Sequence, residues 1–451
     1  MDVDCSRRIS RRELLKRAGA GLAAVAATGL GLGPVFMGEP VLAGQISQPP
    51  IRIEPNPVLK VLRWSAFVRD DEDIWLRNTR GWEKLTGGSV ETDFLPWPDV
   101  RPKAAMEALI GAGHDVVFGF YDDPHLYPDK LVDVTDLAED LGKKYGGWYP
   151  ICETYGRVTG SNRWIALPLG ATGYCINYRR SKVQEAGFEA VPGDIGGLLK
   201  CCKALHAKGH FTGFALGHAV GDANSWTHWW LWSFGGKAVE ADGKTLAINS
   251  KETIQALETA RELHETMIPG VEAWLDPDNN KAFLNDLIVL TPNGSSIACE
   301  AKNSCPRIHD DLAVINMPVG PVGHPAELSL MNAGFIFNHS LVPNAARHYL
   351  AFMLEADQYA SWIGGSGGYV TQALRQYHDL PSWKQDPRIT PYRECSSRMM
   401  PNSHAGPLGT SSAAAMSEYI IVDMFADACM RRRTPQQAAM AAEKRLARLY
   451  R

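Results

Sequence analysis

The sequence predicts an α/β protein built as two lobes. Strands alternate with helices of about 10–15 residues between residues 58 and 120, and this alternation is typical of parallel βαβ units. The same pattern starts again after residue 168. The chain of 451 residues is also longer than one ordinary domain, which favours two lobes with separate hydrophobic cores. We expect a mostly parallel sheet flanked by helices in each lobe.

The individual elements follow from apolar density and from glycine stops. In the first part we expect a strand at 58–64, a helix that ends at Gly87-Gly88, a strand at 89–95, a helix at 100–111 and a strand at 115–120. After residue 168 we expect a strand at 174–178, a helix at 182–186, an aromatic helix within 225–236, a helix at 253–267 and a strand at 313–315. A last helix has Thr434 as its N-cap and Pro435 at its first position.

The first 43 residues have the pattern of an export signal. A basic region at 7–17 precedes a Gly/Ala-rich apolar stretch and the small-residue end Leu42-Ala43. Arg11-Arg12 resembles the pair that the twin-arginine translocase reads. A membrane anchor is the alternative, but glycines and a proline in the stretch make a poor spanning helix. Gln45 stands where a lipoprotein has cysteine, so we expect a soluble periplasmic protein with a linker at 44–57.

Composition excludes several classes of partner and cofactor. With 46 Lys+Arg against 50 Asp+Glu, the net charge of −4 lacks the basic character of a nucleic-acid-binding protein. The nine cysteines show no C-x-x-C and no zinc-ligand spacing. An oxidising compartment allows one or two disulfides, whose pairing the sequence does not define, and we expect most of the thiols to be free and buried.

Two motifs have the form of functional sites without the required context. Gly364-Gly365-Ser366-Gly367-Gly368 matches G-x-S-x-G, but a helical pattern precedes it where a nucleophile elbow needs a strand, so we interpret it as a hinge or cleft loop. The stretch 276–280 begins like a calcium loop, yet Lys281 occupies the position that requires glycine, and helix N-capping explains its polar residues better. We therefore predict no catalytic residue, no cofactor and no metal.

Four stretches together resemble the extracellular solute-binding proteins of ABC importers, of the maltose-binding type. They are "ALPLGATGYCINYRRSKVQEAGF" (166–188), "WWLWSFGG" (229–236), "WLDPDNNKAFLNDLIVLTPNGSSIACEAKN" (274–303) and "EYIIVDMFADACMRRRTPQQAAMAAEKRLARLY" (418–450). The similarity covers nearly all of 58–451, although Arg431-Arg432-Arg433 stands where the family would have a glycine-containing turn. It implies two lobes that close over a ligand by a hinge, as a type II periplasmic-binding-protein fold.

The same resemblance implies where the chain passes between the lobes. The crossings lie near 167–172, 316–319 and 364–369. The N-terminal lobe then combines 58–168 with 317–364, and the C-terminal lobe combines 169–316 with 365–451.

Candidate ligand contacts come from strand ends and from the resemblance. Ligands of open α/β sheets bind beyond the C-terminal ends of strands, which suggests Trp64, Trp97, Tyr121 and Asp122. The family places the start of its tryptophan helix at the cleft, which makes Trp226, with Asn224 and His228 beside it, a wall of the site, while Trp229, Trp230 and Trp232 pack in the core. The resemblance further adds Gly294, Ser295, Tyr369 and the crossover residue Tyr174.

The resulting hypothesis is a monomeric periplasmic protein that captures a carbohydrate and delivers it to an ABC permease. Flat sugar faces pack on aromatic rings while polar neighbours bind the hydroxyls. Two alternatives stay open. A twin-arginine-exported enzyme with an unrecognised site is one. A polyamine or other small-solute binder is the other, since Asp99, Asp122 and Asp123 provide carboxylates and aromatic residues also bind cations.

Overall fold

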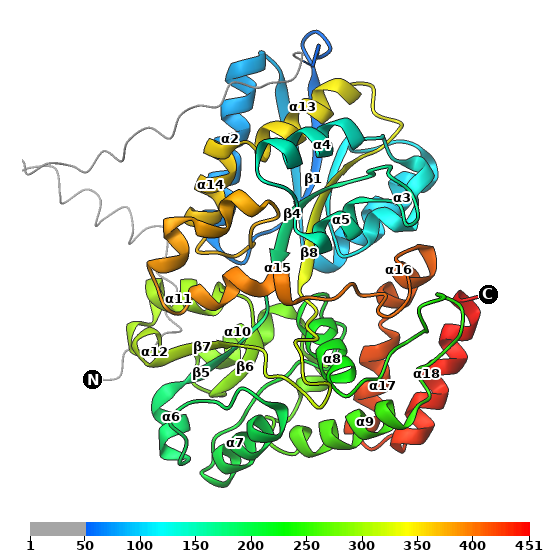
Figure 1. The fold of residues 1–451 in the computed structure, drawn as a ribbon. Helices are drawn as coiled ribbons and strands as arrows, with labels where there is room; N and C mark the ends of the chain where they lie inside the picture. Colours follow the sequence, from blue (N-terminus) through cyan, green and yellow to red (C-terminus); the bar gives the residue numbers. More distant parts are fainter. Residues whose placement is uncertain (1–50) are drawn as a thin grey trace, which may run out of the picture. The chain divides into compact units, whose positions relative to one another are not determined.

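Residues 51–451 are described in the computed structural model of the chain (Figure 1). The signal predicted over 1–43, and residues 44–50 of the predicted linker, lie outside these described residues. The described end of that linker contacts the fold, because the carboxylate of Glu54 accepts hydrogen bonds from the backbone N–H groups of Asn344 and Ala345 at 3.0 and 2.9 Å. Between residues 51 and 451, no helix has the length and apolarity to cross a membrane.

The first lobe is built on a five-stranded sheet in the order β2-β1-β3-β8-β4. Its strands are β1 (Val58–Trp64), β2 (Ser89–Leu95), β3 (Val116–Phe120), β4 (Leu167–Thr172) and β8 (Leu330–Ile336). β1 is parallel to β2 and β3, as the βαβ pattern predicted, whereas β8 is antiparallel to both β3 and β4. The helices of this lobe are α2 (Arg69–Thr86), α3 (Trp97–Ile110), α4 (Thr135–Lys144), α5 (Pro150–Gly156), α13 (Pro343–Met353) and α14 (Ala356–Gly365).

Local sequence accounts for the ends of these elements. α2 begins with three acidic residues, which favour a helix N-terminus, and ends at Gly87, whose left-handed backbone (φ 75°) closes the helix onto the carbonyl of Glu83. The helix predicted at 100–111 begins three residues earlier, at Trp97. Proline is tolerated in the first turn of a helix, where its missing N–H has no partner to lose, so Pro98 starts α3 instead of preceding it.

The second lobe contains a three-stranded sheet in the order β6-β5-β7. Its strands are β5 (Cys175–Arg179), β6 (Leu290–Asn293) and β7 (Leu312–Asn316), and β5 is antiparallel to both neighbours. The expectation of a mostly parallel sheet in each lobe is therefore wrong for this lobe. The reason is direction: β5 starts at Cys175 and pairs there with Asn293 and Asn316, the ends of β6 and β7. A strand that leaves this edge must oppose strands that run toward it.

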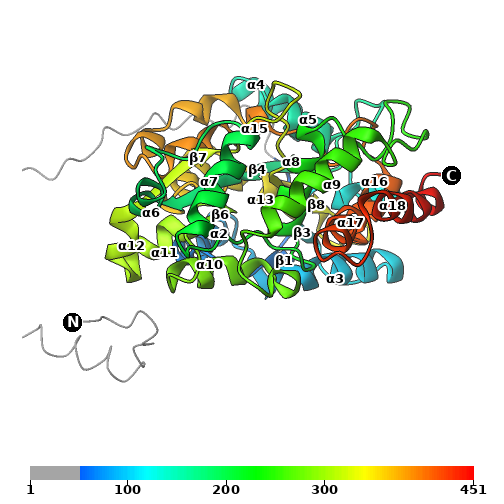
Figure 2. The same cartoon turned by 90° about the horizontal axis from the view of Figure 1, so that it is seen from below.

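Helices surround this second sheet. They are α6 (Arg180–Glu185), α7 (Ile195–Ala207), α8 (Asp222–Ser233), α9 (Lys251–His264), α10 (Asp276–Leu284), α11 (Ser296–Ser304), α12 (Pro306–Asp311), α17 (Ile420–Cys429) and α18 (Pro435–Leu449). The predicted aromatic helix is α8, in which every residue is buried. Figure 2 shows α9 and α17 alongside it, and both helices contact α8. Thr434 and Pro435 start α18 as predicted, because the Thr434 hydroxyl accepts a hydrogen bond from the N–H of Gln437 at 3.2 Å.

The chain between α14 and α17 contacts both lobes, through α15 (Cys395–Arg398) and α16 (Thr410–Ser417) among other short helices. Leu374 pairs with Trp148 of the first lobe, and Met399 pairs with Glu327. The hydroxyl of Tyr392 donates to the carbonyl of Gly294 in the second lobe at 2.8 Å. The lobe boundaries at 168, 316 and 364 stay a prediction, and these contacts show that the last stretch packs against each lobe in turn.

The turn after α17 yields a stability prediction. Arg431, at the position where the family resemblance suggested a glycine-containing turn, has a left-handed backbone (φ 56°). That conformation costs a residue with a side chain about 1–2 kcal/mol, and the exposed ion pair of Arg431 with Glu265 offsets little of it. Because glycine also has more freedom to lose on folding, we expect Arg431→Gly to raise the free energy of unfolding by about 0.5 kcal/mol. Urea unfolding of the variant and of the native chain measures this difference in the free energy of unfolding.

Arg432→Gly is the matched control for this prediction. Arg432 carries a similarly exposed side chain one position later and is not among the residues with a left-handed backbone. Glycine at this position removes no unfavourable left-handed conformation, so Arg432→Gly should leave the free energy of unfolding unchanged or lower it. An Arg431→Gly variant that unfolds at lower urea than the native chain would contradict the argument.

Candidate functional site

A small cavity lies between the two lobes, where the end of β4 in the first lobe meets the start of β5 and the end of β6 in the second lobe. Its volume of about 10 Å³ accommodates a single water molecule. Four aromatic side chains line it, namely Phe67, Trp97, Tyr174 and Tyr369. The remaining lining residues are polar or small: Thr172, Asp222, Asp276, Asn280, Asn293, Gly294 and Ser296.

Four residues that the sequence suggested as ligand contacts meet in this cavity. Trp97 starts α3, Tyr174 lies between β4 and β5, Gly294 follows β6, and Tyr369 follows α14. They come from four separate segments and from both lobes. The predicted positions at strand ends and crossings therefore converge on one place.

Three polar atoms in the lining are buried without a hydrogen-bond partner. They are the indole Nε1 of Trp97, the carboxylate Oδ2 of Asp222 and the hydroxyl of Tyr369. Each residue is at most 5 % exposed. Buried polar groups are nearly always hydrogen-bonded, and leaving one unpaired costs about 1–3 kcal/mol. The cavity thus presents two hydrogen-bond donors and one acceptor. A ligand with hydroxyl groups would bond to all three.

Two carboxylates flank the cavity, and they have different partners. The oxygens of Asp276 accept hydrogen bonds from the N–H groups of Val220, Gly221 and Asp222 at 2.8, 2.8 and 2.9 Å, so Asp276 caps the start of α8. Asp222 interacts with Tyr174 and Asn279, and its second oxygen is free for a ligand. Burial, reinforced by the charge of Asp276, raises the pKa of Asp222 well above its usual range.

The sequence did not single out Asp222 and Asp276. The polar run 276–280 was interpreted as capping its own helix, and Asp278 does this, since its carboxylate accepts a hydrogen bond from the N–H of Leu275 at 2.9 Å. Asp276 instead caps α8, a different helix about fifty residues earlier in the chain. The local sequence indicated a role for Asp222 only through its position one turn before Trp226. An acidic residue at that position is favourable at a helix N-terminus.

Trp226 does not line this cavity, and its expected role as a wall of the site needs correction. Its ring lies in the core of the second lobe, against Phe214 and Phe425, and its indole N–H donates to the carbonyl of Ala215 at 2.5 Å. The start of α8 does face the other lobe. However, Trp226 lies one helical turn after Asp222 on the same face of α8, and residues 214–215 cover its ring there.

Asn224 and His228 have partners in α8 or just before it. The Nδ2 group of Asn224 donates to the carbonyl of Val220 at 3.0 Å, and Nδ1 of His228 lies 2.8 Å from the carbonyl oxygen of Asn224. Burial lowers the pKa of His228 to about 4, so the ring is neutral at pH 7. Neither residue lines the small cavity.

The other predicted contacts are buried and do not line the cavity. Trp64 packs on Phe120 with ring centroids 5.4 Å apart, inside the first lobe. The hydroxyl of Tyr121 lies 3.3 Å from both the carbonyl of Val220 and Oγ of Ser225, so it joins the end of β3 to the start of α8. Asp122 accepts hydrogen bonds from Asn402 and Ser412, each at 2.8 Å. Ser295 is fully buried, and its hydroxyl has no partner.

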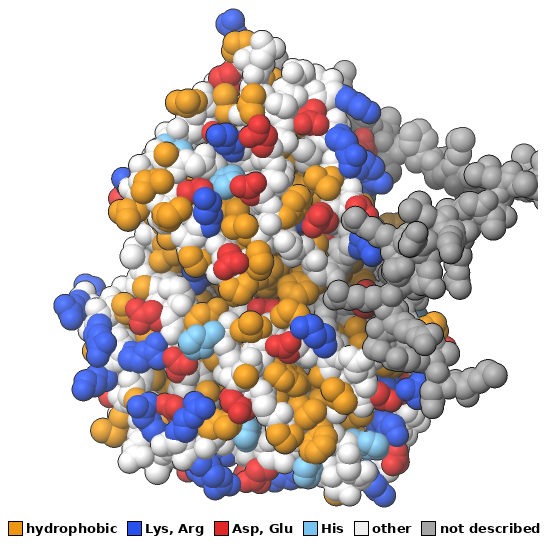
Figure 3. All heavy atoms as spheres, turned by 180° about the vertical axis from the view of Figure 1, so that it is seen from behind, with side chains coloured by type: hydrophobic (Ala, Val, Ile, Leu, Met, Phe, Trp, Pro, Cys, Tyr) orange, Lys and Arg blue, Asp and Glu red, His pale blue; other side chains and the backbone are white. Residues whose placement is uncertain are grey.

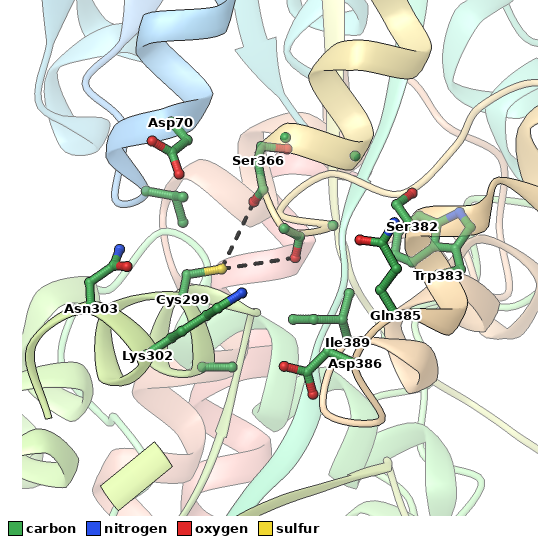
Figure 4. Close-up of a pocket in the computed structure, with 16 residues that line it drawn as sticks. Asp70, Cys299, Lys302, Asn303, Ser366, Ser382, Trp383, Gln385, Asp386 and Ile389 are labelled. Atoms are coloured by element: carbon green, nitrogen blue, oxygen red, sulfur yellow. Dashed lines mark hydrogen bonds between the residues drawn. The ribbon is translucent and has the colours of Figure 1, made fainter. Parts of the chain in front are cut away.

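A second, larger cavity of about 240 Å³ lies next to the first (Figure 4). It is lined by the start of α2, by α11, by the end of α14 with residues 366–368, and by residues between 382 and 389. Cys299 lies 4.0 Å from the carbonyl oxygens of Ser366 and Gly367, and Lys302 and Asp386 border the same space. The hydroxyl of Ser366 donates to the carbonyl of Ile363 at 3.3 Å, and a helix precedes it. The G-x-S-x-G motif is thus a cleft loop, as the sequence context indicated.

A metal site is not indicated in the part of the chain that the structure describes. Residues 51–451 hold no group of three or more His, Cys, Asp or Glu side chains that could bind a metal ion. Basic and acidic side chains are interspersed on the face shown in Figure 3. The three consecutive arginines after α17 illustrate this, since they pair with Glu265 and Asp427.

Comparison with known proteins identifies the fold. Similar structures include maltose-bound MalE3 of T. maritima (20% identity, TM-score 0.75, 87% of this chain and 100% of that one) and a ribitol complex of an ABC transporter solute-binding protein from Agrobacterium radiobacter K84 (17%, 0.72, 88% and 100%). A sugar transporter from Arthrobacter chlorophenolicus A6 with bound laminaribiose is similar at 15% identity and a TM-score of 0.74, over 86% of this chain and 98% of that one. The TM-scores of 0.72–0.75 show that this chain shares the two-lobed fold of these proteins.

The family assignment rests on the sequence itself. No curated protein sequence matches the chain. The model of the bacterial extracellular solute-binding protein family matches residues 82–391, more than half of the chain. The chain belongs to the bacterial extracellular solute-binding protein family.

Proposed function

We propose that this protein captures a carbohydrate or polyol in the small cavity between its lobes and delivers it to the permease of an ABC importer. The observation that carries the proposal is the set of unpartnered polar atoms of Trp97, Asp222 and Tyr369 around one cavity. Hydroxyl groups both donate and accept, so a polyhydroxylated ligand can satisfy all three. The aromatic rings beside them suit the apolar faces of a sugar. Maltose, laminaribiose and ribitol in the similar structures support this class of ligand.

Binding would proceed by closure of the lobes. A cavity of about 10 Å³ does not hold a sugar, so ligand enters when the lobes are apart and the bound form is wider than the structure described. A ligand that contacts both lobes stabilises the closed arrangement over the open one. Tyr121, whose hydroxyl reaches Val220 and Ser225, is part of the surface that opens. The lobes would have the boundaries suggested by the sequence, 58–168 with 317–364 and 169–316 with 365–451.

The wider setting follows from the proposed role. The protein would be exported by the twin-arginine translocase, lose residues 1–43, and act in the periplasm as a monomer without a lipid anchor. It would dock on the permease subunits in its closed form. It would carry out no reaction, in contrast to the alternative of an exported enzyme.

A small cation is the second candidate ligand. Aromatic residues and the carboxylates of Asp222 and Asp276 favour it in principle. However, Asp276 already accepts three backbone hydrogen bonds, which leaves one carboxylate oxygen for a ligand. A polyamine carries at least two charges and would need a second free carboxylate. The hydroxyl-bearing ligand therefore fits better.

A thermal-shift screen tests the proposal. The full chain is heated with monosaccharides, disaccharides, polyols and polyamines, each in excess. Ligand at one hundred times its Kd stabilises the folded protein by about 2.7 kcal/mol, which raises Tm by a few degrees. We expect hits among sugars or polyols. A response to polyamines alone would assign the cavity to cations, and a panel without any hit would contradict a carbohydrate-binding function.

A further inference from the structure

A third cavity, of about 410 Å³, shares no lining residue with the two cavities described above. Residues between 148 and 161 of the first lobe form one wall. Residues between 401 and 408, in the segment that connects α15 to α16 (Figure 1), form the other. Arg375 completes the lining. The volume is in the range of about 300–1,000 Å³ that is typical of small-molecule sites.

Hydrogen bonds tie the two walls of this cavity together. The hydroxyl of Tyr155 accepts the backbone N–H of Asn402 at 2.9 Å and donates to Oδ1 of the same residue at 2.9 Å. The hydroxyl of Thr159 donates to the carbonyl of Leu408 at 2.7 Å. These side-chain contacts fix the segment after α15 against α5, so the space between the walls is defined by the fold.

Two guanidinium groups border the cavity, and an aromatic ring positions each of them. Cζ of Arg157 lies 5.0 Å from the ring centroid of Trp164, and Cζ of Arg375 lies 5.5 Å from that of Tyr149. The backbone N–H of Arg375 also donates to the carbonyl of Gly147 at 2.9 Å. A guanidinium group that stacks on a ring still presents N–H donors at its edge, and these match the oxygens of a carboxylate or a phosphate.

The positive charge of these two arginines is only partly compensated. Glu153 is the one acidic residue in the lining, and its carboxylate lies 3.2 Å from Nη1 of Arg157. Nε of Arg157 is buried without a hydrogen-bond partner. Within residues 51–451, no carboxylate forms an ion pair with Arg375. The lining therefore carries a net positive charge.

Apolar side chains line the same cavity beside the arginines. The ring of Trp148 packs on Trp164 with centroids 5.3 Å apart, and Trp164 is the ring on which Arg157 lies. Leu408 and three prolines add to this apolar surface: Pro150, Pro401 and Pro407. A cavity with both a cationic and an apolar part suits an anion that has an apolar body.

We propose that this cavity is a second binding site, which takes a small organic anion. The carboxylate or phosphate group of the ligand pairs with Arg157 and Arg375, and its apolar body packs against Trp148 and Leu408. This ligand differs in chemistry from the hydroxylated ligand proposed for the cavity between the lobes. The site therefore goes beyond the proposed carbohydrate-binding function and does not depend on it.

Isothermal titration of the full chain tests the proposal with two probes. Benzoate and phenyl phosphate join one aromatic ring to the two kinds of oxyanion, and the tighter of them identifies the preferred oxyanion. Benzyl alcohol has the ring without the charge, and inorganic phosphate has the charge without the ring. We expect an aromatic anion to bind and both comparison compounds to bind at least about tenfold more weakly. No binding of either aromatic anion, or equal binding of a comparison compound, would overturn the proposal.

Substitutions in the lining locate the bound probe. Arg157→Gln and Arg375→Gln should each weaken its binding about tenfold, because each removes a charged hydrogen-bond donor. Arg307→Gln is the matched control, since the side chain of Arg307 is 79% exposed on α12 in the second lobe, and it should bind the probe as the native chain does. The Tm of each variant without probe reports its folding. An equal loss in all three variants would contradict the assignment.

Glu153→Gln should have the opposite effect and strengthen binding of the probe roughly two- to fivefold. The substitution removes the carboxylate that competes for Arg157 and repels an anion. Both side chains of this ion pair are more than a third exposed, so its loss should change the Tm little. A damaged fold would not bind an anion more tightly. Weaker binding in Glu153→Gln would therefore overturn the proposed pairing of the anion with Arg157.

Discussion

Replacing Asp222 by asparagine is expected to weaken ligand binding roughly 30- to 1000-fold. Asp222 is 3 % exposed, lines the small cavity and has one carboxylate oxygen without a partner. Burial disfavours the charged form of Asp222 in the free protein, and a ligand hydroxyl that donates to this oxygen stabilises that form through a charge-assisted hydrogen bond. Removing one partner of such a buried pair costs about 2–4 kcal/mol. Isothermal titration with the ligand found in the thermal-shift screen measures the loss.

The stability of the ligand-free Asp222→Asn variant distinguishes binding from folding. Asp222 is buried beside Asp276, and its raised pKa shows that the charged form is unfavourable there. Neutral asparagine relieves this cost, so the variant should unfold at the same urea concentration as the native chain, or at a higher one. Asp310→Asn serves as the control, because the side chain of Asp310 is 81% exposed on α12. Native-like affinity in Asp222→Asn would exclude this carboxylate as a ligand contact.

Two tryptophans provide a further control within the same experiment. Trp97→Phe keeps a ring at the cavity but removes the unpartnered indole N–H, so it should weaken binding with little effect on stability. Trp226→Phe alters the core of the second lobe and should lower stability without changing the affinity of the folded protein. If Trp226→Phe alone impaired binding, our correction of the role of Trp226 would be wrong.

Replacing Asp71 by alanine is expected to lower the free energy of unfolding by about 3–5 kcal/mol. Asp71 and Arg63 form an ion pair at 2.6 Å in which both side chains are fully buried. The guanidinium group lies 4.4 and 4.6 Å from the ring centroids of Trp64 and Trp75, and the second oxygen of Asp71 accepts the indole N–H of Trp362 at 2.6 Å. Without Asp71 the buried positive charge has no counter-charge and the indole loses its acceptor. Urea unfolding followed by tryptophan fluorescence measures the change.

A double variant shows whether the unpaired charge causes the loss. Arg63→Met combined with Asp71→Leu removes both charges and keeps apolar volume, so it should recover most of the stability that Asp71→Ala loses. A double variant as unstable as the single one would attribute the effect to packing. A cost below 1 kcal/mol for Asp71→Ala would show that water reaches Arg63 in solution.

The sequence by itself determined much of the fold, because the signals involved are local. The extents of β1 and β2, the stop of α2 at Gly87 and the start of α18 at Thr434 all follow from residues within one or two turns of each other. Four of the predicted ligand contacts, Trp97, Tyr174, Gly294 and Tyr369, also line one small cavity, since strand ends and crossings in this fold meet at one edge. Their role as ligand contacts stays a prediction.

Only the tertiary structure decided which polar group is left for a ligand. Asp276 and Asp222 are both acidic residues at helix starts, and the sequence does not distinguish them. Asp276 is satisfied by the backbone of another helix, whereas one oxygen of Asp222 is not. Trp226 illustrates the same limit, because periodicity places it on the face of Asp222 but does not show that residues 214–215 cover it. Whether a buried group is partnered depends on chain segments far away in sequence, and hydrophobic patterns describe only near neighbours.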